Sequence, residues 1–133
     1  LGIEDPIERI LALCDAFFSH LERGVFPGGC FFISVAAEFD THPGEVKERV
    51  ADFQQKWFSR LEALARQAQE AGQIALDEDI TQLIFEVDAF LLMANMSFLL
   101  NNNDPVALER GRRSIRARLE RARPAGEPAK KPA

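Results

Sequence analysis

The sequence predicts an all-α fold, a bundle of five helices in one domain. Apolar residues recur every three or four positions through most of the chain, which is the period of a helix with one buried face. Short stretches rich in glycine, proline, asparagine or aspartate separate these segments, and such residues start and stop helices. With 133 residues, the chain is long enough to bury a core without disulfides or metals.

The first two helices are expected on either side of a glycine-rich turn. The first, over residues 5–23, begins with Asp5 as its cap and ends at Gly24. The second, over about 30–40, is apolar in its first two turns, so we expect it to be covered on most sides. A buried strand is the competing interpretation for residues 31–35, but the alanines and the glutamate that follow favour a helix.

The third helix is the longest. It begins near Thr41 or His42 and runs to about Ala71, where Gly72 ends it. Its apolar residues form a single stripe that includes Trp57. At 1.5 Å per residue the helix would be roughly 40 Å long, enough to cross the domain.

The fourth helix, expected from Asp77 to Leu100, is apolar almost all round. One face carries Ile80, Ile84, Val87, Leu91, Ala94 and Phe98, and the opposite side carries Phe85, Leu92, Met96 and Leu99. One face can pack on the core, so the other needs a partner, and a second copy of the chain is the simplest one. The most apolar run, 89–100, is too short to cross a bilayer.

The fifth helix is capped by Asp104 and runs to about 122, with one narrow apolar stripe. Gly111 lies in the middle of it and costs about 1 kcal/mol relative to alanine. Close approach of another helix would compensate, and an interface is a natural place for it. Residues 124–133 are rich in proline, alanine and lysine, which predicts a disordered tail.

Composition and charge narrow the classes of function. The chain has 11 Phe, 1 Trp and no Tyr, which suits a core or an apolar pocket better than a sugar or nucleotide site. A net charge of −5 argues against direct binding of nucleic acid. Residues 105–133 nevertheless carry 9 Lys and Arg against 3 Asp and Glu, which fits a solvated helix face or an acidic partner. Cys14 and Cys30 form no metal or redox motif, and no segment resembles a signal peptide, so a reduced, cytoplasmic setting fits.

No catalytic or metal-binding pattern is visible in the sequence. His20 and His42 lie near helix ends, with no nucleophile and acid arranged around them. There is no phosphate-binding glycine loop and no spacing typical of metal ligands. We therefore expect neither an enzyme nor a cofactor; a small helical enzyme that depends on Glu86 is the remaining alternative.

Large apolar side chains from four helices would converge if the helices pack around one centre. A solid core explains most of them, and a ligand cavity is the alternative. Large rings are hard to pack without gaps, methionine adapts to varied ligands, and Ser34, Glu86, Asp88 and Asn95 are isolated polar residues among apolar neighbours. The residues alone leave both interpretations open. The candidate ligand-binding residues are Phe17, Phe18, Phe31, Ser34, Trp57, Phe85, Glu86, Met93 and Met96. If Glu86 is buried, it needs a partner, which could be a ligand or an arginine across a dimer.

Several segments, taken in order, carry a resemblance to a known family. They are FPGGCFF at 26–32, AAEF at 36–39, Pro43 at the start of the helix that holds Trp57, AGQI at 71–74, DITQ at 79–82, FE at 85–86 and AN at 94–95. This order resembles the C-terminal domain of TetR-family transcriptional regulators over residues 3 to about 122.

The resemblance implies a function. In that family an N-terminal helix-turn-helix domain binds DNA, the C-terminal helices enclose an effector pocket, and the last two helices pair with their twofold mates in a four-helix bundle. Effector binding shifts the spacing of the two DNA-binding heads and usually releases the operator. Residues 1–123 would thus be the ligand-binding and dimerisation domain of a regulator, expected to be a repressor, that responds to a small hydrophobic effector.

The resemblance also implies an interface and a missing part. The candidate interface residues are Phe90, Ser97, Leu108, Gly111, Ile115 and Leu119. The DNA-binding domain is absent from residues 1–133, so we expect this chain to reach operator DNA only through such a domain, and we expect no membrane partner. A helical dimerisation module without a ligand pocket is the alternative.

Overall fold

The structure, a computed structural model, describes residues 3–25 and 29–126, with the side chains of Phe31 and Phe32 left aside. Over these residues it is all-helical, without a strand, as the sequence predicts. The helices are α1 (Pro6–Glu22), α2 (Phe31–Phe39), α3 (Glu45–Glu70), α4 (Ile80–Leu100) and α5 (Val106–Arg121). Most of the tail predicted to be disordered, 127–133, lies outside the described residues.

The helix starts follow the capping residues in the sequence, except in α3 and α4. Helix α3 begins at Glu45, after its cap Gly44, and not near Thr41 or His42 as expected, because residues 41–44 belong to the turn after α2. Asp5 accepts hydrogen bonds from two backbone amides of the first turn of α1, at 2.9 and 3.1 Å. Asp104 accepts one from the first amide of α5 at 3.0 Å, although it lies one residue before the cap position, which Pro105 occupies. The cap of α4 is Asp79, which accepts from a backbone amide at 3.0 Å, whereas Asp77 lies in the turn before the helix. Asp77 and Asp79 are close together in the sequence, and only Asp79 has a carboxylate that reaches the free backbone amides at the start of α4.

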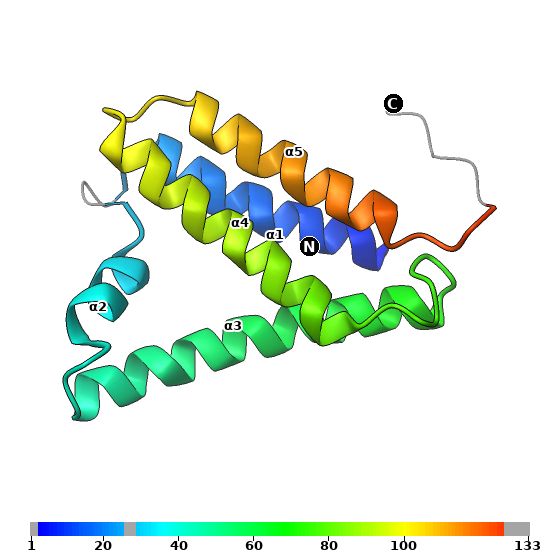
Figure 1. The fold of residues 1–133 in the computed structure, drawn as a ribbon, viewed down its shortest axis with the longest axis horizontal. Coiled ribbons are helices and arrows are strands. Elements are labelled where there is room, and N and C mark those ends of the chain that lie inside the picture. Colours follow the sequence, from blue (N-terminus) through cyan, green and yellow to red (C-terminus); the bar gives the residue numbers. More distant parts are fainter. Residues whose placement is uncertain (1–2, 26–28, 127–133) are drawn as a thin grey trace.

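Three helices and half of a fourth form the core. Figure 1 shows α1, α4 and α5 side by side, with α3 crossing below them. The buried residues come from α1, from the second half of α3 after Leu61, from the turn that follows α3, and from α4, α5 and Ala122 just after α5. A methyl group on Gly111 would lie 2.8 Å from Phe18 Cζ and 2.9 Å from Ala94 Cβ. The close approach predicted at this glycine therefore occurs inside the chain, where α5 packs on α1 and α4.

Two arginines of α5 form ion pairs with the helices on which α5 packs. Arg112 pairs with Asp15 and Glu22 of α1, each at 3.0 Å, and its guanidinium lies over the Phe18 ring, 5.1 Å from the centroid. Arg118 pairs with Glu86 of α4 at 2.9 Å and with Glu78 in the turn before α4. Charge-assisted bonds of this kind fix the angle at which α5 lies on its neighbours.

Residues 30–60, which follow the turn after α1, are packed more loosely than the core. Between Cys30 and Arg60 no described side chain is buried. The stretch is nevertheless rich in large apolar residues: Ile33, Val35, Phe39, Val46, Val50, Phe53, Trp57 and Phe58. We expected α2 to be covered on most sides, but its described residues are half-buried or exposed, because in this chain α2 packs mainly against α3.

Helix α4 is long and apolar enough to cross a membrane when judged by length and composition alone. The 21-residue helix thus passes the length test that its apolar run 89–100 alone would fail. Eight of its residues, however, are buried against the rest of the chain. One face of this helix therefore belongs to the protein core.

Candidate functional site

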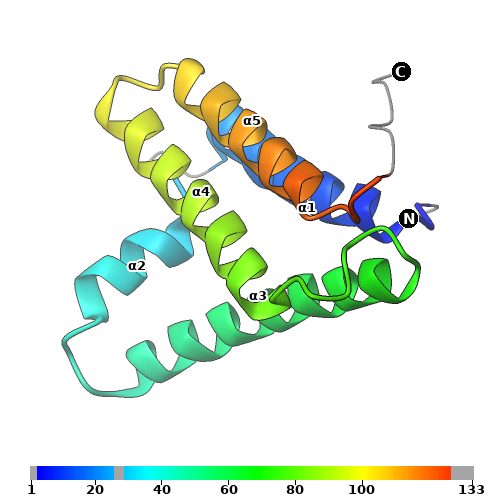
Figure 2. The ribbon, with the colours of Figure 1, turned by 45° about the vertical axis from the view of Figure 1, so that its right-hand side comes forward.

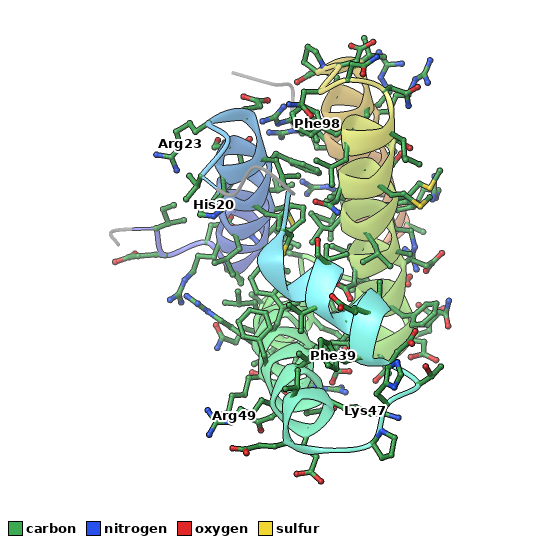
Figure 3. The ribbon with its side chains drawn as sticks, turned by 90° about the vertical axis from the view of Figure 1, so that its left-hand side faces the viewer. His20, Arg23, Phe39, Lys47, Arg49 and Phe98 are labelled. Atoms are coloured by element: carbon green, nitrogen blue, oxygen red, sulfur yellow. The ribbon has the colours of Figure 1, made fainter. Side chains whose placement is uncertain are left out.

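Helix α2, the first half of α3 (45–60) and α4 form three sides of a triangle, which we call the helical frame (Figures 1 and 2). The short turn 40–44 joins α2 to α3. Figure 3 looks at the frame from the side of α2, with Phe39 at the end of that helix. Two polar contacts join α4 to the other sides.

The first contact fixes the start of α2 on α4. The side chain of Asn95 is almost fully buried, and its Oδ1 accepts a hydrogen bond from the backbone amide of Cys30 at 3.1 Å. Gly29 has a φ of 80°, and a methyl group there would come within 2.6 Å of Leu99 Cδ1 and 2.9 Å of Asn95 Oδ1. The backbone therefore passes directly against α4, at a point where only glycine fits.

The second contact joins α3 to α4. Trp57 Nε1 donates a hydrogen bond to Asp88 Oδ1 at 3.2 Å, and both side chains are half-buried. Loss of water around the carboxylate raises the pKa of Asp88, and the indole hydrogen bond offsets part of that rise. Burial raises the pKa of the Cys14 thiol to about 12, and the charges of Asp88 and Asp15 add to the effect. The Asp88 carboxylate thus raises the pKa of a thiol on α1 and accepts a hydrogen bond from α3.

Asp88 differs from the other acidic side chains that are withdrawn from solvent. Among the described residues, Glu62, Glu78 and Glu86 each form an ion pair with an arginine. Asp5 caps a helix and also accepts a hydrogen bond from Gln73. Asp88 has no cation in the described part of the chain, and its one hydrogen-bond donor there is the neutral indole of Trp57. A charge kept partly out of water without a cation is a candidate for a functional group.

The predicted ligand-binding residues fall into separate places. Phe18 is fully buried in the core, and Phe17 packs edge-to-face against it with 5.8 Å between centroids. Trp57 lies in the frame, Ser34 is exposed on α2, and the side chain of Phe31 is outside the description.

The α4 members of that set lie outside the frame. Phe85, Met93 and Met96 are 63%, 56% and 48% exposed. Glu86 is held by Arg118 of the same chain, which supplies the partner that a withdrawn carboxylate needs. The structure therefore does not gather the eight described candidates in one pocket, and Trp57 is the one that lies beside the Asp88 carboxylate.

Two isolated polar residues of the frame lie outside the set of predicted ligand-binding residues. Asp88 and Asn95 are seven residues apart, which is two helical turns, so they lie along one edge of α4 about 10 Å apart. That spacing is the signal that could have selected them over Glu86, which lies on the edge facing α5.

The predicted interface residues also divide into two groups. Phe90, Ser97 and Gly111 line an open groove of about 430 Å³ between α4 and α5, together with Met93 and Arg110 among others. Leu108, Ile115 and Leu119 are 0%, 1% and 4% exposed, so they face the core of their own chain. The apolar stripe of α5 packs against α1 and α4 of the same chain, so these three side chains are not available to contact a second chain.

The outer surface of α4 remains apolar. Its exposed side includes Phe85, Leu92, Met93, Met96 and Leu100, and Val106 continues this side at the start of α5. A second hollow, of about 310 Å³, lies at the turn between α2 and α3 and is lined by Phe39 and His42 among others. Asp88 lines neither hollow, but it is partly exposed and so can be reached from solvent. The described residues contain no cluster of side chains suited to a metal ion.

Comparison with known proteins places this arrangement in a family. No curated protein matches the chain. The profile of a family described as "Tetracyclin repressor-like, C-terminal domain" matches residues 6–115, which include α1 to α4 and most of α5. The chain belongs to the family of TetR-type C-terminal domains.

Proposed function

We propose that residues 1–123 are the effector-binding and dimerisation domain of a cytoplasmic transcriptional repressor that responds to a small apolar molecule. It acts by binding and by a shift between conformations, without catalysis. Operator DNA would be bound by a helix-turn-helix domain that is not part of residues 1–133. Membership of the family supports both the dimer and the effector.

The observation that carries the proposal is the apolar outer side of α4. The inner side of the helix is buried in the core, while Phe85, Leu92 and Met93 remain half or more exposed. Apolar surface of this extent on one element marks an interaction site. A twofold copy would lay α4 and α5 against their mates and cover this surface, with the α4–α5 groove receiving side chains of the partner.

Sedimentation equilibrium of the chain at micromolar concentration tests the dimer. Met93→Glu places a charge in the groove, and we expect it to raise the dimer dissociation constant by about tenfold or more, because a charge at an apolar contact must lose its water. Leu76→Glu is the matched control, since Leu76 is 87% exposed in the turn at the opposite end of α4. A wild-type chain that is monomeric at this concentration would overturn the proposed dimer.

The runner-up is a dimerisation module that binds no effector. The two functions differ in what an apolar probe such as n-octanol does to the wild-type chain. An effector site in the frame predicts a rise in Tm together with a change in the emission of Trp57, the only tryptophan. A module without a pocket predicts neither.

A further inference from the structure

The unpaired Asp88 carboxylate indicates what kind of effector the frame accepts. Its Oδ1 takes the Trp57 hydrogen bond at 3.2 Å, and no described residue is placed to neutralise its charge. A carboxylate can accept about four hydrogen bonds, and the described residues supply one to Asp88, from Trp57. Asp88 is partly exposed, so a molecule entering from solvent can contact it.

The surroundings of Asp88 favour a cation with an apolar body. Trp57 and Phe53 share one face of α3, four residues apart, and both are incompletely buried. On α2, half-buried Val35 and Phe39 are four residues apart, so they add apolar surface on one face of that helix. Aromatic faces beside a carboxylate are the surroundings in which proteins bind ammonium groups.

Other ligand classes fit less well. An anion would meet the negative charge of Asp88 and no withdrawn cation, because Lys47, Arg49, Lys56 and Arg60 on α3 are all exposed. A metal ion would need several ligands, and the described residues hold no group of three or more acidic, histidine or cysteine side chains suited to one.

We propose that the effector of this domain is an amphipathic amine, whose ammonium group pairs with Asp88 while its apolar body lies in the frame of α2, α3 and α4. The inference rests on the proposed effector site and specifies its ligand. The ammonium donates to the free Asp88 oxygen, and Trp57 keeps its hydrogen bond to the other. The pair forms where water is partly excluded, so it contributes more than an exposed ion pair would.

Three probes of equal chain length separate charge from hydrophobicity: octylammonium, n-octanol and octanoate. Their binding to the 133-residue chain is followed by Trp57 emission and by the rise in Tm. We expect octylammonium to bind about tenfold or more tightly than n-octanol, and octanoate to bind most weakly. Asp88→Asn keeps the shape and an oxygen for the Trp57 bond, and should bring octylammonium to within about twofold of n-octanol. Asp77→Asn removes the same charge from an exposed turn and should leave the preference intact.

The possible results distinguish this inference from the function on which it rests. If n-octanol binds as tightly as octylammonium to the wild-type chain, or if Asp88→Asn keeps the preference for the amine, the frame is an effector site but the amine proposal is wrong. If none of the three probes changes Trp57 emission or Tm, the frame is not an effector site and both proposals fail.

Discussion

At the scale of single residues, Asp88 is the group whose surroundings are least explained by the needs of folding. It is held partly out of water, and its charge is balanced by an indole N–H alone within the described residues. Loss of water raises its pKa, which means that the folded chain binds the Asp88 proton more tightly than the unfolded chain does. At neutral pH the ionised carboxylate therefore lowers the free energy of unfolding.

We predict that Asp88→Asn raises the free energy of unfolding at pH 7, because the amide is neutral and can still accept the Trp57 hydrogen bond. The gain should shrink as the pH falls through the folded-state pKa of Asp88, and vanish below the pKa of an unfolded aspartate, where wild-type Asp88 is protonated in both states. Urea denaturation at a series of pH values measures this, with Asp77→Asn as control. A variant that is less stable than wild type at pH 7 would contradict the role given to Asp88.

The spacing of Asp88 and Asn95 places them on one edge of α4, but the sequence does not show which edge of this helix is left without an arginine. Asp88 and Glu86 are two residues apart on one apolar helix, and each is polar among apolar neighbours. Which of them finds an arginine depends on where α5 crosses α4, and this is set by tertiary packing. In the structure Arg118 takes Glu86, and the opposite edge, with Asp88, faces Trp57.

At the scale of elements, the helices themselves could be predicted well, because caps, glycines and apolar periodicity are local signals. Asp5, Gly24 and Gly72 lie where the sequence places helix ends, and both glycines have positive φ, at 62° and 77°. The partner of each face could not be predicted. The sequence predicts that a second chain covers the stripe of α5 with Ile115, whereas the structure packs this stripe in the core of its own chain. An apolar stripe predicts that one face of the helix is buried, but it does not show whether the same chain or a second chain covers that face.

Among the described residues, the Asn95 side chain accepts the hydrogen bond that attaches the start of α2 to α4. Asn95→Ala removes the acceptor of the Cys30 amide, and a lost hydrogen bond of this kind costs about 1–3 kcal/mol. We predict that α2 detaches more often while the core stays folded. Chymotrypsin, which cuts after the phenylalanines of α2, should cleave this variant several-fold faster than wild type.

Asn101→Ala is the matched control for that measurement, since Asn101 is exposed at the end of α4 and donates to the Ser97 carbonyl of its own helix. Equal cleavage rates for the two variants would show that Asn95 does not fasten α2. A large fall in the melting temperature of Asn95→Ala would indicate instead that the contact supports the whole core.

At the scale of the whole molecule, the chain combines a tight core with a loose frame, and α4 belongs to both. Its inner edge carries Asp88 and Asn95, which join the frame, while its outer side carries exposed Phe85 and Met93. An effector that draws the helices of the frame together would therefore move α4, which is also the helix that contacts the partner chain in the proposed dimer. That arrangement supplies a physical route from ligand binding to the relative position of two protomers.

Hydrogen–deuterium exchange of the chain with and without saturating n-octanol tests the central claim, that the frame is the effector site. Amides that open locally exchange fastest where few apolar contacts hold them. Without n-octanol we predict faster exchange over 31–60 than in α1 and α5, and with n-octanol we predict slower exchange that is confined to 31–60 and the facing part of α4. Protection that is absent, or that appears equally in α1 and α5, would contradict the account.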